Sequence, residues 1–339
     1  MNKSYFFVVL TMLFFACTSD RLDVYVDTGQ TDIPLLRMEQ DLPHELVSIE
    51  QTKAINSELI KKYGLLYELF VGRMIQEGSV NDPMIGDYLF KRFNTDALMK
   101  EVLPELNSAF GDFSSYEKEI EEALSYCQYY FPDSAMPDKI ITFFSYFNAH
   151  AMVVDNSLCV GVEMYLGSDH ESVRKLPGMD FPQFFKNKMD EKYLTANTVK
   201  AWLLENYYAC SGEDFLDKII AAGKIMYLMD AVLPDKDPGI KMAYSSKEIE
   251  WAQSNENKVW QYMIEQDVLY SKDEMLETNW ITDGPFTKGL SDESPARMGI
   301  WMGWQIVKDY MDANRDVTLT QMVNEPNAKR ILKYYDPKG

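Results

Sequence analysis

The chain has 339 residues, with 53 acidic side chains, 33 basic ones and three histidines, and its formal net charge is -20. Because nucleic acids are bound mainly through Lys and Arg contacts to phosphates, this charge argues against a nucleic-acid partner. Apolar residues make up 46% of the chain, which excludes a disordered protein. The length is sufficient for one large domain with an ample core.

The first residues are typical of a bacterial sorting signal. Lys3 precedes an apolar run from Tyr5 to Ala16, which is shorter than the roughly 20 apolar residues of a membrane-spanning helix. Such a segment favours a secretory signal peptide over residues 1–16. Ala16 is followed by Cys17, as in the lipobox of bacterial lipoproteins, so we predict lipid attachment at Cys17. An ordinary signal peptide with a coincidental cysteine is the alternative.

The mature chain is predicted to fold as one domain behind a leader. Residues 17–41 are polar with scattered apolar positions, and we interpret them as a lipid-anchored leader. Residues 42–339 then form a single globular domain, helical over 42–131 and sheet-containing over 138–339. The helical part shows apolar residues at spacings of three and four, for example Leu59, Tyr63 and Leu66.

The helical period changes after residue 131. Ile140 to Phe147 is a continuous apolar run, and Asp155-Asn156 has turn chemistry. From Leu158 to Leu166 large apolar residues alternate with other types, which predicts a strand with Glu163 on the face opposite the core. The expected fold is therefore α+β, mostly helical with a small antiparallel sheet.

Helices are expected again after Gly167, and several have recognisable start signals. We predict a helix over Asn197–Ala209, one capped by Ser211 that runs to Leu233, and one over Ile249–Leu269 behind a capping box at Ser245 and Glu248. Ser294-Pro295 predicts the start of a last long helix that reaches Tyr310. Cys127, Cys159 and Cys210 are expected to be buried thiols, with one disulfide as the alternative.

No catalytic motif can be found. His44-Glu45 is followed by Ser48 where H-E-x-x-H needs its second histidine. The chain also lacks a nucleophile elbow, a phosphate-binding loop and a dinucleotide-binding loop. We therefore predict no catalytic residue, no metal and no cofactor.

The most distinctive segment is Ser294–Tyr310, in which Gly299 and Gly303 lie one helical turn apart. Two glycines inside a helix cost about 1 kcal/mol each relative to alanine, which indicates close packing against another element. Arg297 is the charge in this segment best placed for a specific contact. It is expected either to pair with a buried carboxylate or to bind an anionic ligand.

These features together resemble the gliding motility lipoprotein GldB family of the Bacteroidetes. The residues that carry the resemblance are Ala16-Cys17, Val160–Gly167 with Asp169-His170, Leu176-Pro177, Gly223–Tyr227 through Leu233-Pro234, Trp251–Glu256 with Trp260, Gly284-Pro285 and Ser294–Tyr310. The resemblance implies a lipoprotein of the cell envelope, in the outer membrane, whose partners are envelope proteins of the gliding or secretion machinery.

The same family is in turn similar to zinc-peptidase-like proteins. On that likeness Leu204–Tyr208 would stand where H-E-x-x-H stands, but only Glu205 matches, because Leu204 and Tyr208 replace the two histidines. Lys224 lies near the position of the third, acidic ligand. The resemblance thus implies a degenerate metallopeptidase-like architecture that lacks its zinc.

Three functions are compatible with the sequence. The first is a non-catalytic, membrane-tethered component that binds protein or peptide. The second is a zinc-dependent metallohydrolase with the unusual ligands His150, Glu163, His170 and Glu205. The third is a carbohydrate- or peptide-binding lipoprotein with exposed Trp280 or Trp301. The candidate cleft residues are Glu163, His170, Glu205, Tyr208, Lys224, Arg297 and Trp301.

Overall fold

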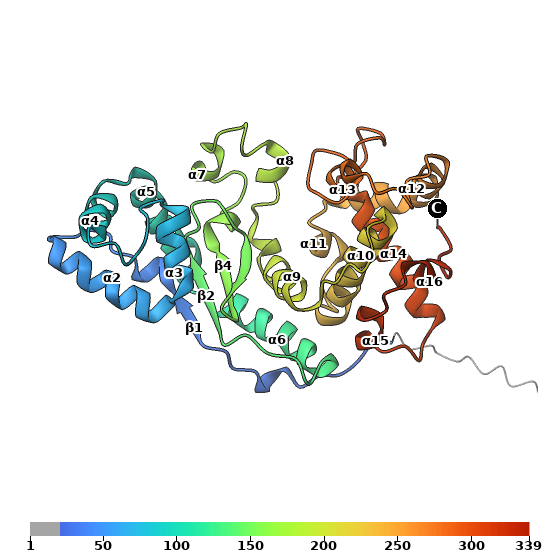
Figure 1. Ribbon diagram of the computed structural model, residues 1–339, viewed down its shortest axis with the longest axis horizontal. Helices are drawn as coiled ribbons and strands as arrows, with labels where there is room; N and C mark the ends of the chain where they lie inside the picture. Colours follow the sequence, from blue (N-terminus) through green and yellow to red (C-terminus); the bar gives the residue numbers. More distant parts are fainter. Residues whose placement is uncertain (1–20, 339) are drawn as a thin grey trace, which may run out of the picture.

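The computed structural model describes residues 21–338 and shows an elongated molecule in three parts (Figure 1). A group of N-terminal helices forms one end, a small sheet lies in the middle, and the C-terminal helices form the other end. Among the described residues, no helix is both long and apolar enough to cross a membrane.

The N-terminal end and the middle contain the helices that precede α10. Their bounds are η1 Thr28–Gln30, α1 Met38–Asp41, α2 Ile49–Tyr63, α3 Leu65–Leu69, the π-helical turn η2 Phe70–Met74, α4 Ile85–Thr95, α5 Ala97–Phe110, α6 Ser114–Tyr130, η3 Val162–Tyr165, α7 Glu171–Arg174, α8 Gln183–Lys186, η4 Glu191–Tyr193 and α9 Leu194–Tyr207.

The C-terminal end is built around two long apolar helices that cross each other, α10 and α14. Its elements are α10 Phe215–Val232, α11 Pro238–Met242, α12 Ser246–Glu265, α13 Glu274–Trp280, α14 Met298–Ala313, α15 Leu319–Val323 and α16 Ala328–Leu332. Helices α6 and α9 connect this end to the sheet, since both pack against α10 and α9 also packs against β3 and β4.

The sheet has four strands in the order β1-β2-β4-β3, with bounds Leu35–Arg37, Lys139–Phe143, Ser157–Gly161 and Ala151–Val154. A mostly helical α+β fold is confirmed, but the prediction of an antiparallel sheet is wrong. Strands β1, β2 and β4 are parallel, and only β3 is antiparallel to its neighbour. The reason is that the chain leaves β2, forms the edge strand β3, and returns through the Asp155-Asn156 turn to place β4 between them.

Strand β4 is shorter than its alternating pattern predicts. It ends at Gly161, and Val162–Tyr165 form a turn of 3-10 helix. All five residues of β4 are buried, because both faces of this central strand are covered. Glu163 therefore has no exposed face to occupy and is completely buried, which corrects the predicted position on the solvent side.

Part of the predicted leader belongs to the globular fold. Leu35–Arg37 pair in register with Ile140–Thr142, so the sheet begins inside the interval assigned to the leader. The Arg37 Nε atom donates to Thr142 Oγ1 at 2.7 Å and to Glu39 at 2.8 Å, which fixes this strand from its side chain as well. Cys17 lies outside the described residues.

Two of the predicted helix starts differ in the structure. Helix α10 is capped by Asp214 together with Asp217, and not by Ser211. Helix α14 begins at Met298 after Arg297, whose backbone is left-handed, and not at Ser294-Pro295. The Ser294 hydroxyl instead accepts a hydrogen bond from the Thr287 amide, so local loop contacts use the predicted cap. The capping box of Ser245 and Glu248 is confirmed.

The three cysteines of the described chain are all free thiols. Cys127 and Cys159 are buried, as predicted, whereas Cys210 is exposed and contradicts the prediction. Cys210 lies in the loop that precedes α10, and the sequence pattern of that loop does not distinguish a core position from a surface one.

Candidate functional site

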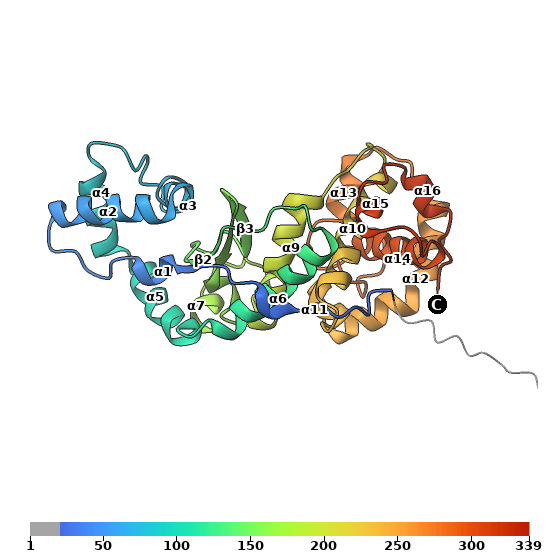
Figure 2. The ribbon, with the colours of Figure 1, turned by 90° about the horizontal axis from the view of Figure 1, so that it is seen from below.

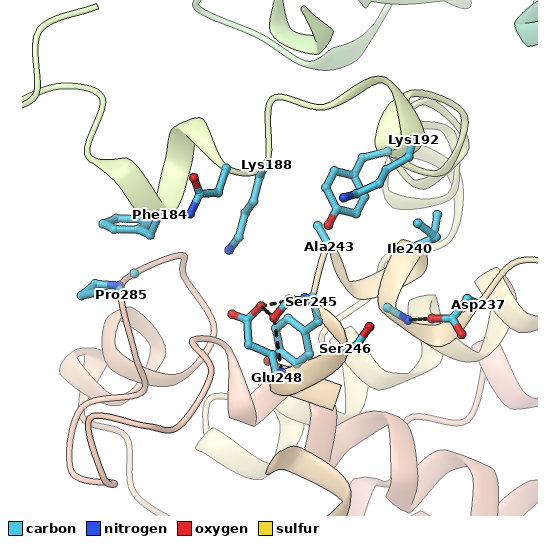
Figure 3. A pocket seen from close by; sticks show the side chains of 15 residues that line it. Phe184, Lys188, Lys192, Asp237, Ile240, Ala243, Ser245, Ser246, Glu248 and Pro285 are labelled. Carbon is cyan, nitrogen blue, oxygen red and sulfur yellow. Dashed lines mark hydrogen bonds between the residues drawn. The ribbon is translucent and has the colours of Figure 1, made fainter. Parts of the chain in front are cut away.

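A cleft of about 570 Å³ lies between the α8–η4 segment and the start of α12 (Figure 3). Two stretches of chain form its walls, one before α9 and one around α11 and α12, and the loop before α14 closes one end. The residues that line it are Phe184, Asn187, Lys188, Lys192, Tyr193, Asp237, Gly239, Ile240, Ala243, Tyr244, Ser245, Ser246, Glu248, Gly284 and Pro285.

The wall at α11 and α12 is fixed by local hydrogen bonds. Asp237 caps α11 through the Gly239 amide at 2.7 Å. After α11 the backbone of Ala243 is left-handed, and Ser245 then opens α12 with Glu248 as its reciprocal partner. These caps satisfy amides that would otherwise face the cleft, so its wall is preformed.

A second, smaller cavity of about 280 Å³ adjoins the cleft, and the two share Lys188 and Ala243. We call it the cationic pocket, because Lys188, Lys200 and Arg297 surround the single carboxylate of Asp283. Its other lining residues are His150, Ala151, Phe185, Asn197, Ala201, Leu204 and Ala243. The edge strand β3, helix α9 and the start of α14 therefore all contribute to it.

Asp283 is the centre of this charge cluster. Its Oδ1 atom accepts a hydrogen bond from Lys188 and lies 3.5 Å from the Nε atom of Arg297. The guanidinium of Arg297 also donates to the Met242 carbonyl and lies over the Tyr244 ring, 5.4 Å from its centroid. The Lys200 Nζ atom donates to the Lys241 carbonyl at 2.7 Å. Arg297 and Lys200 are thus both bound to backbone carbonyls of α11, and Lys188 is bound to Asp283.

The crowding of cations changes the acidity of these groups. Burial, and then the neighbouring Arg297 charge, lower the pKa of Lys188 to about 8. Burial, followed by the charges of Arg297 and Lys188, lowers the pKa of Lys200 to about 7. Burial raises the pKa of Asp283, but Arg297 and Lys188 lower it by more, so its net shift is downward. Near neutral pH, the pocket therefore carries more positive than negative charge.

His150 forms an aromatic wall of the same pocket. Its ring centroid lies 5.6 Å from that of Tyr165 and 5.5 Å from that of Phe185, both in edge-on contact. Burial, with a further contribution from the Lys188 charge, lowers the pKa of His150 to about 4. The imidazole is therefore neutral at physiological pH.

The residues predicted from the sequence do not gather at one site. Of the seven candidates, only Arg297 lines the cationic pocket. Glu205 and Tyr208 are exposed near the end of α9. The face of that helix that reaches the pocket carries Asn197, Lys200, Ala201 and Leu204 instead. Arg297 does pair with a carboxylate, that of Asp283, but this residue is exposed and not buried as predicted.

The other predicted residues have structural contacts of their own. His170 caps α7 by accepting from the Ser172 amide at 3.4 Å. Lys224 is buried and donates to the carbonyls of Val323 and Glu325 at 3.1 and 2.6 Å. Trp280 and Trp301 are buried, which contradicts a sugar-binding surface built on exposed rings.

The alternative metal set is not assembled either. Within residues 21–338, no three His, Cys, Asp or Glu side chains lie close enough together to hold a metal ion. His150, Glu163, His170 and Glu205 therefore do not form a ligand cluster.

Sequence reasoning missed Lys188, Lys200 and Asp283. A signal for Lys200 was present, because it is the only charged residue among those of α9 that precede Glu205. For Lys188 and Asp283 the sequence contains no comparable signal.

Fold and site together define a mostly helical α+β protein with a preformed cleft and an adjoining cationic pocket. The family model described as gliding motility protein GldB matches residues 19–337, nearly the whole chain. The chain belongs to this family, as its sequence resemblance predicted. No curated protein and no solved structure matches it. The likeness to zinc peptidases therefore stays a prediction.

Proposed function

We propose that this chain is a non-catalytic, membrane-tethered component of the gliding motility machinery or its associated secretion apparatus, and that it binds a polypeptide in its cleft. Membership of the gliding motility family supports a role in that machinery. The lipobox-like Ala16-Cys17 supports a lipid anchor in the cell envelope, which we place at the outer membrane.

The observation that carries the binding role is the cleft with its adjoining cationic pocket. The two cavities together measure several hundred Å³. The cleft presents polar and charged side chains beside Phe184, Ile240 and Pro285, and the adjoining pocket combines apolar wall with convergent charges, which are the surfaces that a ligand site needs. The Ser245 hydroxyl donates to the Glu248 carboxylate at 2.7 Å, but this pair forms the capping box of α12, and no cluster of metal ligands occurs among the described positions. Binding without chemistry is the function that this set of side chains supports best.

The proposal is tested by photo-crosslinking in living cells of the source organism. Phe184 in the cleft is replaced by p-benzoylphenylalanine, and Tyr88, an exposed aromatic residue of α4, receives the same replacement as the matched control. We expect Phe184, but not Tyr88, to capture a defined envelope protein. In a Cys17→Ala background the chain should leave the membrane fraction and the captured product should decrease.

Two outcomes would contradict the proposal. Equal capture from both positions would show that the cleft has no special role. Hydrolysis of envelope peptides by the purified chain, abolished by a chelator, would show that the protein is a metallohydrolase.

A further inference from the structure

The charge of the cationic pocket is out of balance with its surroundings. In a chain with 53 acidic residues, Lys188, Lys200 and Arg297 line a pocket in which Asp283 is the one carboxylate, and Glu248 of the adjoining cleft is a second negative charge that acts on Lys188. The side chains of Lys188 and Arg297 are only 13% and 14% exposed, and that of Asp283 is 31% exposed. Burying like charges together destabilises a fold unless something compensates them.

The pocket also retains hydrogen-bonding capacity that the protein does not use. The Nε atom of Arg297 is buried and has no hydrogen-bond partner among the described residues. Lys200 donates to one backbone carbonyl, and no described carboxylate lies within ion-pair distance of its Nζ atom. A lysine ammonium has three donors, so two remain for a ligand. Both groups line the same cavity.

We infer that the cationic pocket binds a carboxylate group of the polypeptide that occupies the cleft. This inference rests on the proposed function and names the chemistry of its ligand. The pocket and the cleft share Lys188 and Ala243, so a chain in the cleft can place one acidic group in the pocket. The carboxylate comes either from the C-terminus of that chain or from an Asp or Glu side chain.

The geometry favours a carboxylate over a phosphate. Asp283 in the pocket and Glu248 beside Lys188 offset two of the three cations, so a single negative charge completes the balance, whereas a dianion would exceed it. Phe185, Ala201 and Leu204 form apolar wall next to the charges, which suits the carbon stem of an amino acid. The bound anion would also favour the charged form of Lys200, whose pKa the empty pocket lowers to about 7.

The inference is tested by titration calorimetry on the mature chain, purified in detergent. The probes are N-acetyl-trialanine, its C-terminal amide, N-acetyl-Ala-Asp-Ala amide and inorganic phosphate. We expect at least one carboxylate probe to bind and the uncharged amide not to bind. Tighter binding of N-acetyl-trialanine identifies a C-terminal carboxylate as the recognised group. Tighter binding of N-acetyl-Ala-Asp-Ala amide identifies a side-chain carboxylate.

Three variants separate the pocket from general electrostatics. Lys200→Met should weaken probe binding about tenfold, the value of one charge-assisted hydrogen bond. Lys258→Met removes an exposed cation of α12 that lines neither cavity and is the matched control, expected to change affinity less than about twofold. Asp283→Asn should strengthen binding, because it removes the carboxylate that competes with the probe. Without probe, Lys200→Met should melt at a higher temperature than the parent, because the variant removes an uncompensated buried charge.

Several results would overturn the inference. The first is an equal loss of affinity in Lys200→Met and Lys258→Met. The others are binding of the uncharged amide as tight as that of the acids, tighter binding of phosphate, or no binding of any probe. Its failure is distinct from failure of the proposed function. Capture of an envelope protein from Phe184 without carboxylate binding would refute only the inference, whereas carboxylate binding without any captured protein would refute only the polypeptide role.

Discussion

Glu163 is a fully buried carboxylate that holds the loop following β2. Its Oε1 atom accepts hydrogen bonds from the Ser145 amide at 3.0 Å and the Phe147 amide at 2.9 Å, while Oε2 has no partner among the described residues. In this loop Tyr146 and Phe147 both have left-handed backbones, with φ of 57° and 59°. Such conformations are unfavourable for bulky residues, so the carboxyl group stabilises a strained loop beside the edge strand β3.

The stability of the protein should depend on the protonation of Glu163. Burial raises its pKa to about 7 from an ordinary value of 4.5, although hydrogen bonds from Ser145 and Phe147 oppose the shift. Between these values the folded state keeps a proton that the unfolded state releases, so the free energy of unfolding falls as the pH rises. The loss across this window is about 3 kcal/mol.

Glu163→Gln should remove this dependence, because the amide keeps the Oε1 acceptor and carries no charge. Urea unfolding at pH 5 and pH 8 measures the free energy of unfolding of both proteins. The value for the variant minus that for the parent should be larger at pH 8 than at pH 5. Glu205→Gln, at an exposed position, is the control and should follow the parent at both values. A constant difference for Glu163→Gln would show that the carboxyl group does not titrate in this range.

At the scale of secondary structure elements, α10 and α14 pack backbone against backbone. A Cβ atom added to Gly303 would lie 1.8 Å from the Ile219 carbonyl oxygen, and one added to Gly223 would lie 2.2 Å from the Gly303 carbonyl. The glycines thus let two backbones touch. The predicted close packing of Gly299 and Gly303 is confirmed, because an added Cβ at Gly299 would also be 2.8 Å from a backbone oxygen, that of Trp280.

Gly303→Ala should destabilise the protein by about 3 kcal/mol or more, since the new methyl group meets backbone that cannot move without separating the helices. The matched control is Gly86→Ala in α4, where the added methyl would meet only side chains, above all the flexible one of Lys53. At that position the higher helix propensity of alanine should leave the free energy of unfolding unchanged or raise it by up to about 1 kcal/mol. Thermal unfolding of both variants measures the contrast, and equal effects would contradict the backbone contact.

At the scale of the whole molecule, the start of the described chain is joined to its C-terminal half. The segment after Arg21 runs along α6 from the C-terminal helices toward the sheet (Figure 2). Arg21 donates to the carbonyls of Met311 at 2.8 Å and Asn314 at 3.4 Å, and also to that of Val317. These carbonyls lie in and just after the last turn of α14, where helical hydrogen bonding ends.

Arg21→Ala should therefore lower the free energy of unfolding by about 2 kcal/mol, because partly buried carbonyls lose a charged donor. Lys247→Ala, at an exposed position of α12, is the control and should change it by less than about 0.5 kcal/mol. Denaturant unfolding of the mature chain gives both values. An unchanged midpoint for Arg21→Ala would show that the start of the chain does not contribute to the stability of the domain.

The anchor site and this attachment are close together in the sequence. Three residues lie between Cys17 and Arg21, and the four extended steps that join them span at most about 14 Å. A lipid on Cys17 would therefore keep the end of α14 near the membrane surface.

Features that depend on neighbouring residues could be predicted from the sequence. The helical regions, the Asp155-Asn156 turn, the capping box at Ser245 and the close-packing glycines of α14 all follow from local spacing and conformational preference. Family membership also follows from the sequence, since the matching residues extend over most of it. Cap residues were misassigned at Ser211 and Ser294, where contacts within loops compete with the helix for the same side chains.

The tertiary structure alone decided the direction of the strands, the burial of Glu163 and the composition of the cationic pocket. The direction of a strand depends on where the returning chain enters the sheet, and the periodicity of apolar residues in the sequence does not encode this position. Lys188, Lys200, Asp283 and Arg297 come from separate segments of the chain, and although Arg297 and Lys200 stand out locally, no spacing in the sequence joins the four. Their common property, a desolvated excess of positive charge, exists only once the fold brings them together, because electrostatic interaction depends on distance and burial and not on position along the chain.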